Sequence, residues 1–136
     1  MTLTKKRIRE LKEILKYIIR RKSNYGEYYP NLYHLITNIE NINLLERYIP
    51  KLKLIKIIKK EFGKDMTFKK YISLKEHLYR KYFFILHKEI LNKKWNKSDI
   101  VKIKELDDKY FKITYRFLYI HNEIIRKLSK YIKRQK

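Results

Sequence analysis

Residues 99–133 read DIVKIKELDDKYFKITYRFLYIHNEIIRKLSKYIK, and this stretch decides the fold. Apolar side chains recur along it every three or four residues, which is the spacing that places them on one face of an α-helix. The set comprises Ile103, Leu106, Tyr110, Ile113, Phe117, Ile120, Ile124, Leu128 and Tyr131. We therefore predict a single helix of about 35 residues, roughly 52 Å long at 1.5 Å per residue.

A helix of that length exceeds what a compact chain of 136 residues needs, so it must pack on another helix or project into an assembly. The preceding helix is predicted at about 73–91, because Ser73-Leu74-Lys75-Glu76 matches a capping box just before an apolar run. We predict an all-α fold, a helical bundle in which the C-terminal helix (about 99–133) pairs as a hairpin with the helix at about 73–91.

Two glycines and two prolines divide the rest of the chain into further helices: Gly26, Pro30, Pro50 and Gly63. A basic N-terminal helix is expected over residues 4–22, and a second helical pattern runs from Pro30 to Pro50. Residues 51–62 fit partly a strand alternation, but a helix ended by Gly63 fits better. The whole chain, 1–136, is predicted to be a single helical domain with a basic C-terminal tail at 122–136.

The charge is strongly unbalanced. Lysine and arginine number 36 against 14 acidic residues, which gives a formal net charge of +22. So large a charge on a short chain destabilises the compact state by self-repulsion, and a polyanionic partner relieves that repulsion. Nucleic acid is the natural candidate because each neutralised phosphate releases counterions, and an anionic membrane surface is the main alternative.

The positive charge is unevenly distributed. Residues 1–22 carry nine bases and two acids, residues 51–70 eight and two, and residues 122–136 six and one, whereas residues 23–50 carry one base and three acids. We expect the two ends and the middle to meet the polyanion. The slightly acidic stretch is rich in tyrosine and is the expected contact with protein neighbours, through Tyr25, Tyr28, Tyr29, Tyr33 and Tyr48.

Two basic stripes follow from helical spacing. The N-terminal basic stripe comprises Lys5, Arg9, Lys12, Lys16 and Arg20. The C-terminal basic stripe lies roughly 120° from the apolar face at 100° per residue and comprises Lys109, Lys112, Arg116, Arg126, Lys130 and Lys133. Tyr115 and Tyr119 fall within the second stripe, where tyrosines can pack on sugars or unpaired bases. The alternative is that both stripes are solvated faces that serve solubility.

Several kinds of chemistry lack their residues. The chain has no cysteine, its two glycines cannot form a phosphate-binding loop, and its four histidines show no paired ligand spacing, so we expect no cofactor and no metal. The basic start leads into no apolar signal core, and the longest strongly apolar stretch, 82–86, is far below the about 20 residues of a membrane span. We expect a protein that is intracellular or part of a virion. Abundant Lys, Ile and Tyr beside a single Gln, two Met and no Cys are typical of thermophile proteins.

One pattern indicates an enzyme. The segments Arg80–His87 and Arg116–His121 resemble the Arg-x4-6-His motif of HEPN-type ribonucleases, which are small helical bundles. Seven residues return Arg80 and His87 to nearly one helix face, whereas five residues place Arg116 and His121 about 140° apart. The resemblance implies a ribonuclease that uses Arg80 and His87.

The leading hypothesis is a non-enzymatic structural protein that contacts the phosphate backbone of DNA or RNA without strong sequence specificity. We expect it to coat or package a genome, in a virion or a nucleoid. A structural subunit of a ribosome or other ribonucleoprotein is one alternative, and the HEPN-like ribonuclease is the other.

Overall fold

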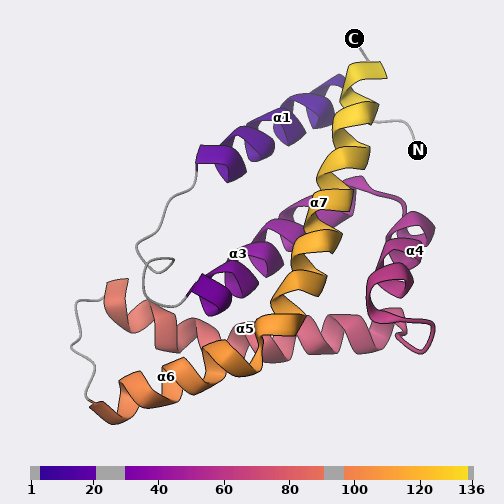
Figure 1. The fold of residues 1–136 in the computed structure, drawn as a ribbon. Helices are drawn as coiled ribbons and strands as arrows, with labels where there is room; N and C mark the ends of the chain where they lie inside the picture. The colour runs from indigo at the N-terminus through magenta and orange to yellow at the C-terminus, as the bar shows by residue number, and fades with distance from the viewer. Residues whose placement is uncertain (1–3, 21–29, 91–96, 135–136) are drawn as a thin grey trace.

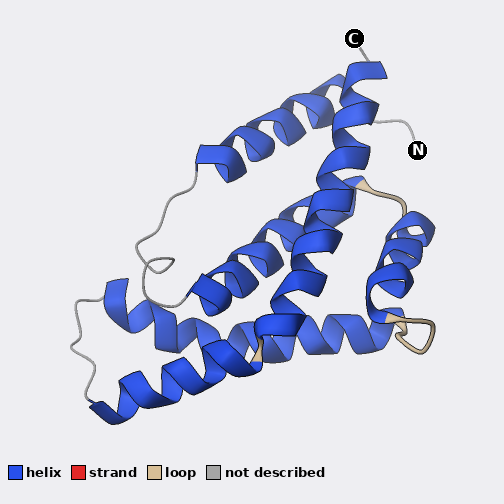
Figure 2. Cartoon of the chain, in the orientation of Figure 1, coloured by secondary structure: helices blue, strands red, loops and turns tan. Residues whose placement is uncertain are grey.

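The computed structural model describes residues 4–20, 30–90 and 97–134, and every regular element within them is a helix (Figures 1 and 2). The helices are α1 (Lys5–Arg20), α3 (Pro30–Leu45), the short 3-10 helix η1 (Glu46–Tyr48), α4 (Lys51–Phe62), α5 (Phe68–Ile90), α6 (Lys97–Lys109) and α7 (Phe111–Arg134). This confirms the prediction of an all-α bundle with a long C-terminal helix packed against other helices. The helices predicted over 30–50 and 51–62 are confirmed as well.

Helix α3 is the centre of the bundle. It carries a single charged residue, Glu40, and its apolar side chains are buried on several sides, so it packs on α1, α5, α6 and α7 at once. Its fully buried side chains are Leu32, Leu35, Ile39, Ile42 and Leu45. A nearly uncharged helix that is buried on most of its sides belongs inside a fold, and the strongly charged helices surround it.

Helix α7 lies across α3 and makes its most extensive contact there (Figure 1). Its buried side chains recur at the predicted spacing, as Phe117, Ile120, Ile124, Leu128 and Ile132. Tyr131, which the pattern assigned to the apolar face, is half-buried beside Ile132. The periodicity of residues 99–133 therefore identified the packing face correctly.

The predicted continuous helix over 99–133 is broken at Tyr110, where the chain turns between α6 and α7 (Figure 1). The hydroxyl of Thr114 lies 2.8 Å from the carbonyl oxygen of Tyr110 and 3.2 Å from that of Asn31 in α3. A hydroxyl bonded back to the preceding turn bends a helix. The bend brings α6 onto α3 as well, so both halves of the C-terminal segment bury apolar surface there.

The predicted hairpin partner, the helix at about 73–91, is replaced by α3. The corresponding helix, α5, begins at Phe68 instead, where the Thr67 hydroxyl accepts the Lys70 N–H at 3.1 Å, so Ser73 is not the cap. Helix α5 runs across the bundle and not alongside α7 (Figure 1). It meets the C-terminal segment through ring contacts, Tyr71 with Phe117 at 5.9 Å and Tyr82 with Tyr110 at 5.0 Å between centroids. The main partner of α7 is α3, which carries one charged residue, whereas α5 carries many.

Two acidic residues serve the interior of the fold. The carboxylate of Asp107, at the end of α6, accepts the Leu32 N–H at 2.8 Å and the Asn31 side-chain amide at 3.1 Å, so it caps the N-terminus of α3 from another helix. Glu46 accepts a 2.8 Å bond from the ammonium of Lys75, which is only 2% exposed and also donates to the Asn43 amide oxygen at 2.7 Å. Both bonds join segments far apart in the sequence.

The Asp107 cap is testable by substitution. Asp107→Ala leaves the buried Leu32 N–H without an acceptor and should lower the free energy of unfolding by about 1–3 kcal/mol. Asp107→Asn keeps an acceptor oxygen and should cost less. Denaturant unfolding followed by circular dichroism measures both variants. Equal stability of Asp107→Ala and the wild type would show that the cap contributes nothing.

Candidate nucleic-acid interface

The N-terminal basic stripe lies on the outside of α1. Leu11 is fully buried, with Ile8, Leu15 and Ile18 half-buried beside it, so the opposite face of α1 is left to solvent. Lys5, Arg9, Lys12 and Lys16 are all exposed on that face. Lys16 has an ion pair with Glu13 at 3.6 Å, but both side chains are more than 60% exposed, so the pair is weak. The side chain of Arg20 lies outside the described part of the structure.

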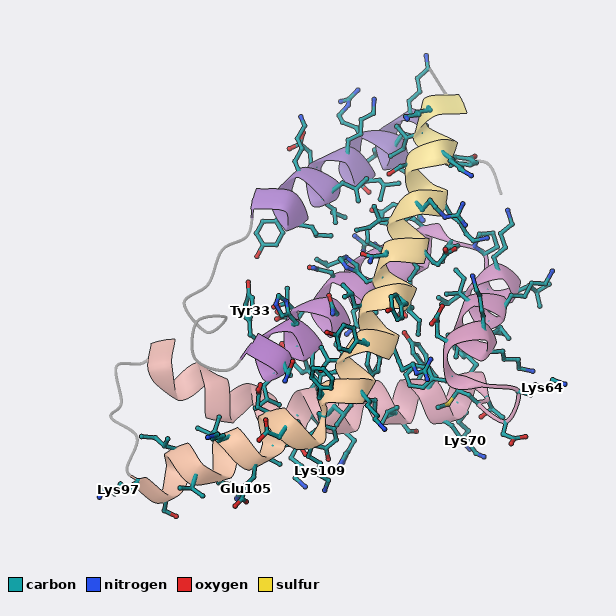
Figure 3. All side chains as sticks on the ribbon, viewed as in Figure 1. Tyr33, Lys64, Lys70, Lys97, Glu105 and Lys109 are labelled. Carbon is teal, nitrogen blue, oxygen red and sulfur yellow. The ribbon has the colours of Figure 1, made fainter. Side chains whose placement is uncertain are left out.

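The C-terminal basic stripe follows α7 for most of its length. Lys112, Arg116, Arg126, Lys130 and Lys133 are exposed and fall within one arc about 100° wide at 100° per residue. Lys109 is also exposed but ends α6, so the break at Tyr110 sets it apart from the other five. Figure 3 shows Lys97 and Lys109 at opposite ends of α6, both pointing outward.

Three exposed aromatic rings line the same side of α7. Phe111, Tyr115 and Tyr119 follow each other at four-residue intervals and are 47%, 43% and 48% exposed. Their ring centroids are 5.1 Å apart in the first pair and 6.3 Å in the second. Tyr115 and Tyr119 thus lie on the surface with the stripe, as the spacing predicted. The sequence analysis did not predict Phe111 as an exposed ring, although its interval of four residues from Tyr115 places it near the same helix face.

A third cationic surface covers α4 and the turn after it. Lys51, Lys53, Lys56, Lys59 and Lys60 are exposed. Lys64 and Lys70 extend away from the bundle beyond the end of the helix (Figure 3). The charge count predicted that residues 51–70 meet the polyanion, but it predicted no individual side chain as a contact. Helical spacing could have done so, because Leu54, Ile57 and Ile58 form the buried face of α4 and the lysines lie on the exposed one.

Carboxylates neutralise little of this cationic surface. One carboxylate that does pair with a cation of the C-terminal basic stripe is that of Glu123, which accepts a hydrogen bond from the Arg126 guanidinium at 2.8 Å. That hydrogen bond is the main reason why the pKa of Glu123 is lowered, and the nearby charges of Arg126, Lys60 and Lys127 add to it. Within the described residues, Lys112, Arg116, Lys130 and Lys133 form no ion pair, so their charges are available to a partner.

The tyrosines expected to contact protein neighbours differ in how far the structure exposes them. Tyr25, Tyr28 and Tyr29 lie outside the described residues. Tyr33 is half-buried, with its ring centroid 5.3 Å from that of His34. Tyr48 is only 1% exposed and belongs to the core, so the expectation that it contacts a partner is wrong.

The two Arg–His pairs do not form a shared surface that the structure describes. Arg80 is exposed on α5, while the side chain of His87 lies outside the described part. Arg116 is exposed and His121 is 7% exposed, so these two side chains face different environments, as their five-residue spacing predicted. Burial lowers the pKa of His121 to about 4, which keeps the imidazole neutral at pH 7.

The described residues contain neither a cluster of metal ligands nor a helix suited to crossing a membrane. No group of three or more His, Cys, Asp or Glu side chains could hold a metal ion there. None of the described helices combines the length and the apolar character that crossing a membrane requires. Comparison with known proteins gave no match to a protein-family model, a curated protein or a solved structure.

The buried imidazole of His121 gives a pH prediction. Its pKa is lower in the folded state than the value of 6.5 expected when unfolded, so the unfolded state binds the proton more readily. Stability should therefore decrease as the pH falls from 6.5 to about 4 and lose nothing further from this group below that, for a total of at most about 3 kcal/mol.

Unfolding free energies of the wild type and His121→Leu across pH 4 to 7 provide the measurement. The difference between the two proteins isolates this histidine from the carboxylates that titrate in the same window. A difference that does not change with pH would contradict the buried, neutral state of His121.

Proposed function

We propose that this chain is a non-enzymatic structural protein that binds the phosphate backbone of nucleic acid without strong sequence specificity and coats or packages a genome. The single observation that carries the proposal is the exposure of cationic side chains along the outer faces of α1, α4 and α7 together. These three helices belong to one bundle, so a polyanion can meet more than one of them.

The placement of the acidic residues adds support. Asp107 caps α3 and Glu46 holds the buried ammonium of Lys75, so two of the few carboxylates are directed inward and do not offset the surface charge. A formal charge of +22 then acts mostly outward and repels itself. Phosphates relieve that repulsion, and the release of their counterions favours binding.

The chemistry of the surface supports binding with little sequence preference. Lysine predominates over arginine, and its ammonium is a point charge on a flexible stem that suits phosphate oxygens. Reading a base edge needs side chains held in fixed geometry, as in bidentate arginine contacts. The exposed rings of Tyr115 and Tyr119 can stack on any unpaired base, because every base has a π-face.

A coat is favoured over a ribonucleoprotein subunit by the regularity of the cationic faces. The basic side chains of α1 repeat every three or four residues, and those of α7 do so in two groups, 112–116 and 126–133, with Tyr119 and Glu123 between them, so each copy of the chain offers the same set of contacts. Such contacts suit a uniform backbone better than an irregular RNA fold. We therefore expect many copies to cover one nucleic acid.

Salt dependence tests the proposal. Fluorescence anisotropy with a labelled duplex should show tight binding at low salt and a linear fall of log K with log salt, by about 0.9 per phosphate contacted. Two unrelated duplexes of equal length should bind with similar affinity. The triple variant Lys112→Gln, Arg116→Gln, Lys130→Gln should reduce the slope by about 3, because three phosphate contacts are lost.

The matched control removes the same charge from α6 through Lys97→Gln, Lys102→Gln and Lys104→Gln, all of which are exposed. It should change the slope by less than the α7 variant does. Absence of binding, or binding that salt does not weaken, contradicts the proposal. Degradation of RNA during the incubation contradicts the non-enzymatic role, and protection of saturated duplex from added nuclease supports the coat.

A further inference from the structure

A cleft runs between the start of α4 and the C-terminal half of α7, two helices that pack side by side (Figure 1). It has two lobes, which share Lys53, Lys127 and Tyr131. We call it the α4–α7 cleft. Because its walls come from segments more than 70 residues apart, only the folded chain brings them together.

The cationic lobe has a volume of about 230 Å³. Its walls consist of Lys53, Arg126, Lys127, Lys130 and Tyr131, and no carboxylate lines it. Lys53, Lys127 and Lys130 line one concavity, and a cleft focuses the field of such charges more strongly than a flat surface does. The fourth cation, Arg126, donates a 2.8 Å hydrogen bond to Glu123, which offsets its charge, so the attraction comes mainly from the three lysines.

The apolar lobe adjoins it and has a volume of about 170 Å³. Apart from the shared residues, its walls are formed by Tyr48, Ile49, Pro50 and Leu128. Pro50 also precedes the first turn of α4, which carries no acidic residue and has no side-chain cap. The N–H groups of that turn lack partners within the helix, and the helix dipole adds positive potential at the same end of the cleft.

We propose that the α4–α7 cleft binds one nucleotide of a nucleic-acid strand, with its phosphate among Lys53, Lys127 and Lys130 and its base or sugar against Pro50 and Tyr131. The ligand class follows from the two lobes, because a nucleotide joins an anionic group directly to a flat, largely apolar ring. The combined size is of the order expected for small-ligand sites, about 300–1,000 Å³. The inference rests on the proposed function and adds one defined anchoring site to a diffuse surface.

Titration calorimetry on the full-length protein at low salt tests the site with three probes: adenosine 5′-monophosphate, adenosine and inorganic phosphate. The nucleotide should bind about tenfold or more tightly than either fragment, since it alone fills both lobes. The double variant Lys53→Ala, Lys127→Ala should weaken nucleotide binding by about tenfold or more, because two charge-assisted hydrogen bonds are lost.

The control variant Lys102→Ala, Lys104→Ala removes the same charge from exposed positions on α6, outside the cleft and the three cationic surfaces, and should change nucleotide binding by less than about twofold. Equal losses in the two double variants, or inorganic phosphate binding as tightly as the nucleotide, overturn the proposal. Salt-dependent oligonucleotide binding by the same proteins would then leave the proposed function intact. Loss of oligonucleotide binding in the wild type removes the proposed function itself.

Chemical-shift mapping on the wild type keeps the test decisive if the Lys53→Ala, Lys127→Ala variant does not fold. Addition of the nucleotide should shift the resonances of Lys53, Lys127 and Tyr131 and leave those of α6 unchanged. Shifts spread over all exposed lysines indicate unspecific charge pairing and overturn the assignment of the cleft.

Discussion

The packing of α7 on α3 is the contact on which the rest of the structure depends. Helix α3 is the only described helix with a single charged residue, and it contacts α1, α5 and α6 as well as α7. In a chain with a net charge of +22, the surrounding helices repel one another, so burial of apolar surface on a common, nearly uncharged helix must outweigh that repulsion. The Asp107 cap reinforces the arrangement, because it ties the start of α3 to the end of α6.

Much of this architecture could be predicted from local signals. Apolar spacing identified the buried face of α7, and Gly63, with a φ of 103°, ends α4 as expected. The break at Tyr110 and the choice of α3 as partner could not be predicted in this way. Both depend on contacts between residues far apart in the sequence, such as the Thr114 hydroxyl with the Asn31 carbonyl and Asp107 with Leu32. Periodicity reports which face of a helix is apolar and not which neighbour will cover it.

The candidate nucleic-acid interface also contains features that local sequence predicts and features that it does not. Exposure of Lys12 or Lys130 follows from helical spacing alone, since whatever lies opposite the apolar face meets solvent. The α4–α7 cleft has no such local signature, because Lys53 and Lys127 are brought together only by the packing of their helices. The role of Asp107 as a buried cap could not be predicted either, because a count of charges treats every carboxylate as part of the surface. Stripes are therefore readable from sequence, whereas concave sites require the fold.

The turn at Tyr110 has a mechanical consequence. Because the chain axis changes direction there, Lys109 and Lys112 lie on helices that do not share one line, and the cationic edge of the protein is bent (Figure 1). A polyanion that touches both arms at once follows a curved path. For duplex DNA, with a persistence length of about 50 nm, that path stores elastic energy, whereas an unpaired strand follows it at little cost. If the proposed nucleic acid contacts both helices at once, the bend therefore favours a flexible strand over a stiff duplex.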